Sequence, residues 1–558
     1  MTLALPPTTA CGGGSSSDDD GPDAGAGADA ESAPDAFVDL TVDAFEPGHL
    51  IEIDIDMAGA DWDTLRNQAR SAIDIFGPPC LQEPFADPFT YFPATVTIDG
   101  VVLEQSAVRK KGFLGSLSAT KPSLIVKLDE YVADRSWSGL ERLTLNNGNQ
   151  DPSLVHTCLA YQVFADAGTP APRCNFAHVT VNGTDLGIYA NVEAIKKPFL
   201  RRHFESDDGD LYEGTLADFR TGWTVNFEKK TNESTPTGPE IDALLEVLEN
   251  AADGELLDQL EPLLDVDGFI REWASEVLIG HWDGYASDTN NFFVYVDPAD
   301  GRMRILPWGA DATFQDPNGA VVAATGILSR RLYLLPETRD RYLAELQRQL
   351  DEVWDESALL GEIDRMETLI TPVADPDGTL GLAASIGTVR TFVSDRQAAI
   401  ETALAGGPPA WTTPLRDPIC FADIGQVDID FATTWNGGFT GTATVNVATY
   451  RGAPISFTQT NAVAGLDTSS GAPIVVPLGT MADGATVFFF LTMAPALVAP
   501  GTQPVDGIAV NGFVIHQPAG QTGAAIAYLD GTLVLNQAAM TPGAPVTGSL
   551  TARLLWWF

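Results

Sequence analysis

Two aspartates and an asparagine surround a predicted hairpin near the middle of the chain. Asp283 lies in a polar loop after a predicted helix, Asn291 begins the first strand of the hairpin, and Asp311 follows its second strand. Phosphoryl transfer needs this set of groups: one carboxylate that positions the attacking hydroxyl, plus an amide oxygen and a second carboxylate that hold magnesium on the phosphates. The spacing is compatible with all three meeting at one mouth of the hairpin. Because Asp and Asn in loops usually form turns or caps, spacing alone does not establish catalysis.

A cluster of basic residues upstream could bind phosphate. Arg109–Lys111 precede a loose glycine loop, Gly112–Ser116, and Lys121 follows shortly after it. A strand lysine that faces an anion is a common way to hold phosphates, and basic residues this dense stand out in an acidic chain. The alternative is a solvated charged face, and the glycine pattern matches neither a Walker loop nor GxGxxG.

A mixed set of strands and helices must position these side chains, and we expect them to form one domain over residues 36–406. The Asn182-Gly183 turn between two alternating segments is a strong hairpin signal. Alternating apolar residues predict strands at Leu50–Ile55, Ala94–Gly100, Leu124–Leu128, Ala177–Val181 and Gly187–Val192. Helical spacing predicts helices at Trp62–Ile75, Asp151–Ala167, Glu240–Ile279, Thr338–Trp354, Ser357–Ile370 and Ile386–Leu404.

Composition changes after Gly406–Pro409. Residues 410–558 are rich in Thr, Val, Ala and Gly, poor in Lys and Arg, and contain many short alternating segments such as Thr442–Val447. Segments of this kind at regular intervals predict a separate antiparallel β-sandwich domain.

The first 35 residues differ from all that follow. Ala10 and Cys11 stand after a short apolar run and before a stretch, Gly12–Pro34, with almost no large apolar residue. This resembles the end of a bacterial lipoprotein signal, with Cys11 as the lipidated residue and a disordered acidic linker behind it. The alternative is a disordered acidic tail with an incidental cysteine. An acidic chain on such a tether is expected in the cell envelope or outside the cell.

The net charge of the chain limits the kinds of partner that it can bind. The 31 Lys and Arg against 76 Asp and Glu give a formal net charge of −45. Such a surface disfavours nucleic acid, and it disfavours an anionic bilayer, so we expect membrane contact only through a lipid anchor. The remaining cysteines, Cys80, Cys158, Cys174 and Cys420, could form two disulfides in an exported protein, with three connectivities open, or stay as buried thiols.

Several blocks, in order between about residues 50 and 400, resemble the CotH kinase family, the spore-coat-protein-H-like proteins. No single block is decisive, but their order and spacing together are specific. The blocks are Arg109–Lys127, Leu143–Ser153, Gly168–Arg173, Val181–Glu193, Trp282–Asn291 and Pro307–Asp311. The resemblance implies an α+β fold class: a divergent protein-kinase-like CotH domain, here followed by the all-β sandwich.

The resemblance also implies roles for individual residues. Asp283 would be the catalytic-loop acid, and Asn291 and Asp311 would hold Mg²⁺ or Mn²⁺. The nucleotide-binding residues for ATP would be Lys121, which grips phosphate, together with Arg109 and Glu193.

The family commonly reads Pro-Trp-Asp-x-Asp where this chain has Gly309 in place of the first acid. A glycine has no side chain to ligate magnesium. Either Asp311, Asp288 or Asp316 substitutes for it, or the site is impaired.

The function implied is transfer of the ATP γ-phosphoryl group to Ser or Thr hydroxyls of a secreted or surface protein outside the cytoplasm. One rival is a pseudokinase that keeps the fold and only binds. Another is a surface-displayed structural or adhesion protein whose sandwich grips a partner. In that case some of the tryptophans Trp411, Trp435, Trp556 and Trp557 would stack on sugars, although core packing is the commoner fate.

Overall fold

The computed structural model describes residues 39–235, 238–417, 419–468 and 470–557. Within them the chain divides into two compact units: a larger one of residues 39–68 and 87–417, and a smaller one of residues 69–86 and 419–557. The expected lipidation residue, Cys11, and the linker after it lie outside the described residues. No helix in the described part of the chain is both long and apolar enough to cross a membrane.

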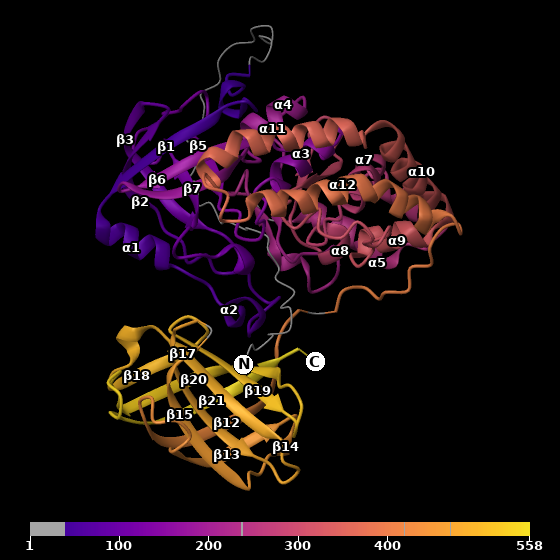
Figure 1. Cartoon of the computed structure of the whole chain (residues 1–558). Helices are drawn as coiled ribbons and strands as arrows, with labels where there is room; N and C mark the ends of the chain where they lie inside the picture. The colour runs from indigo at the N-terminus through magenta and orange to yellow at the C-terminus, as the bar shows by residue number, and fades with distance from the viewer. Residues whose placement is uncertain (1–38, 236–237, 418, 469, 558) are drawn as a thin grey trace. The chain divides into compact units, whose positions relative to one another are not determined.

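The larger unit begins with a closed seven-stranded barrel (Figure 1). Its strands are β1 (Leu50–Met57), β2 (Phe92–Ile98), β3 (Val101–Lys111), β4 (Ser123–Lys127), β5 (Arg142–Asn146), β6 (Cys174–Val181) and β7 (Thr184–Val192). Their spatial order is β1-β2-β3-β4-β5-β7-β6, and parallel pairing of β1 with β6 closes the barrel. Ile51, Ile53 and Ile55 alternate inward along β1, as the sequence predicts.

Local sequence explains the turn that joins β6 to β7. Asn182 and Gly183 both take positive φ, at 51° and 73°. Two central residues with positive φ suit the right-handed twist of a two-residue hairpin, so the predicted Asn-Gly turn is present.

A small sheet and a layer of helices form the rest of the larger unit. The sheet has the order β11-β10-β8-β9, with β8 (Leu211–Gly214), β9 (Phe227–Lys229), β10 (Phe292–Val296) and β11 (Met303–Pro307). The helices are α1 (Gly59–Asn67), α3 (His156–Asp166), α4 (Lys197–His203), α5 (Pro239–Asn250), α6 (Leu256–Leu260), α7 (Val266–Leu278), α8 (Tyr285–Asp288), α9 (Ile327–Leu334), α10 (Pro336–Glu352), α11 (Glu356–Ala374) and α12 (Leu382–Leu404). Short 3₁₀ turns occur at Asp43–Phe45, Leu114–Ser116 and Thr224–Asn226.

The core of the helical layer is centred on α7. Trp273 is fully buried, and its ring stacks on Tyr342 of α10 with 4.0 Å between centroids. The predicted helical stretch Glu240–Ile279 is three helices, α5 to α7, because the chain turns after Asn250 and after Leu260. The predicted helix from Asp151 starts only at His156.

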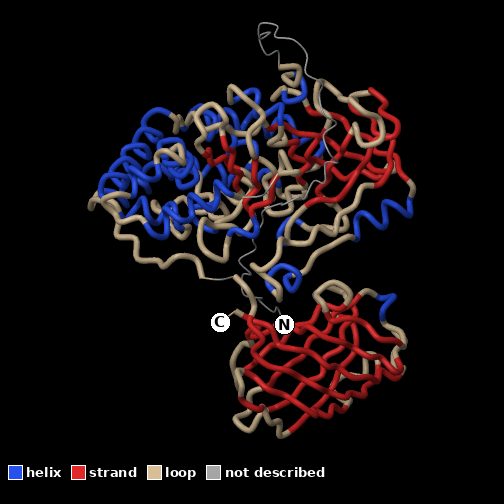
Figure 2. Tube along the Cα trace, turned by 180° about the vertical axis from the view of Figure 1, so that it is seen from behind, coloured by secondary structure: helices blue, strands red, loops and turns tan. Residues whose placement is uncertain are grey.

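The smaller unit contains one ten-stranded sheet that folds over on itself (Figure 2), and its strands pair antiparallel except for one parallel contact, between Val505 and Val510. The strands are β12 (Ala422–Thr434), β13 (Thr442–Tyr450), β14 (Ala453–Pro454), β15 (Gln459–Leu466), β16 (Pro473–Thr480), β17 (Thr486–Met493), β18 (Gly501–Val505), β19 (Val510–Gln517), β20 (Ala524–Gln537) and β21 (Pro545–Trp556), with a 3₁₀ turn at Pro495–Leu497. Inward side chains from both halves of the sheet share one apolar core. The all-β prediction for this region is confirmed.

A segment from early in the chain belongs to the smaller unit. The predicted helix Trp62–Ile75 breaks after Asn67, and its second half is a separate short helix, α2 (Ala72–Phe76). Ser71 and Asp74 form a capping box that starts α2. Residues 69–86 therefore leave the larger unit, to which the sequence analysis had assigned them.

Disulfide and aromatic contacts attach this segment to the sheet. Cys80 is bonded to Cys420, and the Phe76 ring lies 5.5 Å from that of Phe421 and 6.0 Å from that of Trp557. The second disulfide joins Cys158 to Cys174 in the larger unit. The structure thus selects one of the three connectivities that the sequence left open.

The four tryptophans considered for sugar stacking all make contacts within the protein. Trp435 is 2% exposed. Trp411 donates its indole N–H to the Ala324 carbonyl, and Trp556 and Trp557 pack on Tyr528. These contacts support core packing as their role.

Candidate active site

The loop between α7 and β10 brings Asp283 and Asn291 together. Asp283 is fully buried, and the Asn291 amide nitrogen donates to its Oδ2 at 2.8 Å and to its main-chain carbonyl at 3.0 Å. Asn290 donates to the other carboxylate oxygen at 3.1 Å. Two amide groups therefore fix the orientation of the carboxylate.

Burial and neighbouring acids alter the proton affinity of Asp283. Burial raises its pKa well above the ordinary value, and the negative charges of Asp288 and Asp311 raise it further, against the hydrogen bond from Asn290. A carboxylate with a raised pKa binds a proton more tightly when it is ionised, which is the property that a general base needs.

Gly309 makes the position of Asn291 sterically feasible. The hairpin places Gly309 beside Asn291, since the Trp308 N–H donates to the Asn291 carbonyl at 3.1 Å. A Cβ atom on Gly309 would lie 2.3 Å from Asn291 Oδ1, and Gly309 has a φ of 52°. The acid expected at this position would displace Asn291 from Asp283.

Asp311 and Lys111 line the same pocket, together with Asn146, Asp151 and Trp308. Lys111 donates from Nζ to Asn146 Oδ1 at 2.7 Å and lies 5.6 Å from the centre of the Trp308 ring. Burial raises the pKa of Asp311 to about 7, with the charge of Asp151 adding to the rise and that of Lys111 opposing it. A cation and an acid therefore share one cavity.

Asp151 and His156 link the start of α3 to this pocket. Asp151 is buried and accepts the His156 N–H at 2.8 Å, while His156 Nδ1 lies 2.9 Å from the Asp311 carbonyl oxygen. The sequence analysis did not select either residue. An Asp-Pro-Ser turn before a helix reads as a cap, and nothing in it points to Asp311.

Lys121, the lysine that the resemblance selected, lies in an adjoining pocket. That pocket shares Asn147, Gly148, Asp151 and Leu154 with the first. Lys121 Nζ donates to the Ile188 carbonyl at 2.7 Å, and burial lowers its pKa to about 8. Lys111, rather than Lys121, is the lysine that the structure places beside Asp311.

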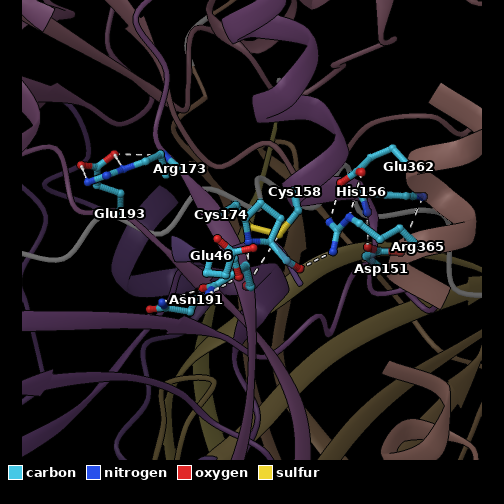
Figure 3. The surroundings of a disulfide bond; sticks show 12 residues. Glu46, Asp151, His156, Cys158, Arg173, Cys174, Asn191, Glu193, Glu362 and Arg365 are labelled. Carbon is cyan, nitrogen blue, oxygen red and sulfur yellow. Dashed lines mark hydrogen bonds and ion pairs between the residues drawn. A yellow bond between two sulfur atoms is a disulfide. The ribbon is translucent and has the colours of Figure 1, made fainter. Parts of the chain in front are cut away.

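Arg109 and Glu193 are engaged elsewhere in the larger unit. Arg109 is 1% exposed and forms an ion pair with Asp87 at 2.9 Å. Glu193 pairs with Arg173 at 2.8 Å and also with Arg202. Figure 3 shows Glu193 and Arg173 on one side of the Cys158–Cys174 disulfide, with Asp151 and His156 on the other. Neither Arg109 nor Glu193 lines the two pockets described above.

The two acids considered as substitutes for Gly309 differ in position. Asp288 forms an ion pair with Arg416, and its charge contributes to the raised pKa of Asp283. Asp316 is exposed, and its Oδ1 accepts the Asn318 N–H. Of the two, only Asp288 is electrostatically coupled to Asp283.

The donor set suits a magnesium ion that binds together with phosphate. Magnesium usually takes one or two protein carboxylates and completes its shell with water and substrate phosphate oxygens. Asp311 fits that pattern, because its partly buried carboxyl lies near a second acid, Asp151, whose charge raises its pKa. Among the described residues, no group of three or more His, Cys, Asp or Glu side chains forms a complete metal cage.

Comparison with known proteins identifies the family of this chain. The family model described as CotH kinase protein matches residues 108–400, slightly more than half of the chain. The chain belongs to the CotH kinase family. Asp283, Asn291, Asp311, Lys111 and Lys121 all fall inside the CotH match.

Individual relatives are distant. The inner spore coat protein H of Bacillus subtilis (strain 168) is 24% identical over 261 residues, which cover 43% of this chain and 71% of that protein. The spore coat protein homolog 1 of Rhizopus delemar is 24% identical over 195 residues, 33% of this chain and 31% of that protein. Among solved structures, the proinflammatory kinase CtkA of Helicobacter pylori matches with a TM-score of 0.23 and 9% identity, over 51% of this chain and 93% of that chain.

The CotH match begins inside β3 and ends inside α12. Strands β1 and β2 precede it, although both belong to the closed barrel. The fold class expected from the sequence, an α+β CotH domain followed by an all-β region, is confirmed.

Proposed function

We propose that the CotH domain transfers the γ-phosphoryl group of ATP to a Ser or Thr hydroxyl of another protein. The observation that carries the proposal is that Asn291 donates to Asp283 and lies against Gly309, which lines one pocket with Asp311 and Lys111. In the proposal, Asp283 acts on the hydroxyl, and phosphates bind where Asp311 lies with the lysine.

Each group has a separate task in this proposal. Asp283, held by two asparagine amides, orients the acceptor hydroxyl and takes its proton. Lys111 neutralises phosphate charge, and Asp311 with the Asn291 amide oxygen would hold Mg²⁺ or Mn²⁺. The bound metal would supply further charge neutralisation on the phosphates. Lys121 and the adjoining pocket lie beside this centre and contribute no step.

Location outside the cytoplasm is part of the proposal. Two of the relatives are named for the spore coat, which is an outer structure. Two disulfides in the described structure fit an oxidising compartment. Lipidation at Cys11 would attach the protein to the envelope, and the acceptor would then be a secreted or surface protein.

One observation favours a second candidate, a pseudokinase that binds nucleotide without transfer. Both carboxylate oxygens of Asp283 already accept amide hydrogen bonds, and Gly309 removes an acid that the family commonly carries. In that case nucleotide would bind in the Lys111 pocket and no phosphate would leave it.

Radiolabel transfer separates the two candidates. The full chain is incubated with γ-labelled ATP in Mg²⁺ or Mn²⁺, with casein as an added acceptor, and label is followed on casein and on the chain itself. We expect labelling that falls by about 100-fold or more in Asp283→Asn, as expected when a general base is lost. Asp316→Asn, an exposed acid outside the site, is the matched control and should label normally. An unlabelled wild type, or equal labelling of Asp283→Asn, would overturn the kinase proposal.

A further inference from the structure

Two glutamates on α7 lie buried directly behind the Asp283 loop. Glu272 and Glu276 are one helical turn apart and are 0% and 2% exposed. Glu276 accepts the Tyr285 N–H at 2.8 Å through Oε1 and the Ala286 N–H at 3.0 Å through Oε2. Its carboxylate therefore caps the start of α8, two residues after Asp283.

The fit between Glu276 and the loop is close. A Cβ atom on Gly284 would lie 2.1 Å from Glu276 Oε1. The backbone conformation of Gly284 is one that any residue can adopt, with a φ of −85°. Steric space for the carboxylate, rather than chain flexibility, is therefore what this glycine provides.

The pair has little positive charge near it. His281 Nδ1 lies 3.9 Å from Glu276 Oε1, and burial lowers the pKa of His281 to about 4, so its ring is neutral. Among the described residues, no Lys or Arg forms an ion pair with either glutamate, and no N–H or O–H donor reaches either oxygen of Glu272. Two buried carboxylates without a cation cannot both be ionised.

Within the described part of the chain, both oxygens of Glu272 are buried without a hydrogen-bond partner, and burial together with the charge of Glu276 raises the pKa of Glu272 well above its ordinary value. Glu276 accepts two N–H groups, which favour its ionised form. The proton therefore resides on Glu272, and Glu276 is the ionised member of the pair.

We propose that Glu276 is a positioning residue for catalysis, whose ionised carboxylate holds the backbone that carries Asp283, next to a neutral Glu272. Glu276 does not touch substrate and acts through the loop between α7 and β10. The catalytic consequence rests on the proposed kinase function, whereas the loop-holding role does not.

This role of Glu276 also depends on pH. Burial raises the pKa of Glu276 to about 7, so a second proton weakens its acceptor strength below neutrality. The groups that face Glu276 are Glu272 on α7, His281 after it and Tyr342 on α10, and Arg396 of α12 faces Tyr342 in turn.

Hydrogen exchange measured by mass spectrometry on the full chain tests the loop-holding role without any activity. Glu276→Gln keeps the volume but loses one acceptor, so residues 281–291 should exchange about tenfold faster. Gly284→Ala pushes the carboxylate away from the other side and should have the same effect. Glu272→Gln keeps a neutral side chain of the same size beside Glu276 and should exchange like the wild type.

Asp265→Asn is the matched control, because Asp265 caps the start of the same helix and lies far along it from the loop. It should leave exchange of residues 281–291 unchanged. Unchanged exchange in both Glu276→Gln and Gly284→Ala would overturn the proposal, as would faster exchange in Glu272→Gln equal to that in Glu276→Gln.

Kinetics add a second readout when the wild type transfers phosphate. Glu276→Gln should lower kcat by about tenfold at an unchanged KM for ATP, since the loop moves but the Lys111 pocket does not. A raised KM with unchanged kcat would contradict a role in positioning Asp283. If the wild type transfers nothing, the kinase proposal fails while the exchange result still decides the loop-holding role.

Discussion

Asn291 lies against Asp283 in space that only a glycine at position 309 leaves free. The Asn291 backbone has a φ of 54°, a conformation that asparagine tolerates better than most residues. Its amide then reaches both the carboxylate and the main-chain carbonyl of Asp283. Gly309 stands where the family commonly has an acid, and it allows a local arrangement in which Asn291 contacts Asp283.

Restoring that acid should therefore harm the protein. We expect Gly309→Asp to lower the free energy of unfolding by about 1–3 kcal/mol, because the new side chain meets Asn291 and the positive φ is strained. Urea denaturation measures this. Gly301→Asp is the control, since Gly301 has a φ of 72° and open space around it, so it carries the backbone strain alone. Equal effects of the two substitutions would contradict the steric account.

Asp311 should make stability depend on pH. Its pKa is about 7 in the folded protein against an ordinary value of 3.8, so the folded state binds more protons than the unfolded state between those values. Its contribution therefore favours folding in acid and declines as pH rises from about 4 to about 7.

Asp311→Asn removes this contribution. We expect the difference in free energy of unfolding, variant minus wild type, to be about 1–4 kcal/mol larger at pH 8 than at pH 5. Urea denaturation of both proteins in metal-free buffer at the two pH values measures this. Parallel behaviour of the two proteins across that range would show that Asp311 ionises freely.

At the level of elements, the sequence predicts where strands and helices occur better than it predicts which elements they pack against. Alternation in β1 and the Asn-Gly turn depend on neighbours in the sequence, so both could be predicted. The sequence could not show which lysine, Lys111 or Lys121, lies beside Asp311. That choice depends on β5, which supplies Asn146 to Lys111, and on β7, which supplies the Ile188 carbonyl to Lys121.

The position of residues 69–86 is a second case of this kind. Helical spacing continues from α1 into α2, and nothing local signals that the second helix packs on a sheet formed hundreds of residues later. The Cys80–Cys420 disulfide, with a sequence separation of 340, could not be distinguished from its alternatives by spacing.

Each disulfide should protect only its own unit. Loss of a native disulfide typically costs about 2–5 kcal/mol, so Cys80→Ser should speed hydrogen exchange in β12 and β21 and leave β6 and β7 unchanged. Cys174→Ser is the matched variant and should do the reverse. Faster exchange in both units from either substitution would contradict the division into two units.

At the scale of the whole molecule, the proposed site places one lysine beside two aspartates, Asp151 and Asp311, in a strongly acidic chain. The net charge of −45 repels ATP in general, so binding must depend on local groups and on a metal that neutralises phosphate. Lys111 is the buried cation that lines the pocket with Asp311, and this makes it the most sensitive probe of the site.

Calorimetric titration of the full chain with ATP, in Mg²⁺ and in EDTA, tests this claim most directly when the wild type is compared with Lys111→Met and Lys121→Met. We predict metal-dependent binding that weakens by about tenfold or more in Lys111→Met, through loss of one charge-assisted contact to phosphate. Lys121→Met should bind nearly as the wild type does. Absence of ATP binding by the wild type, or a loss in Lys121→Met as large as that in Lys111→Met, would contradict the account.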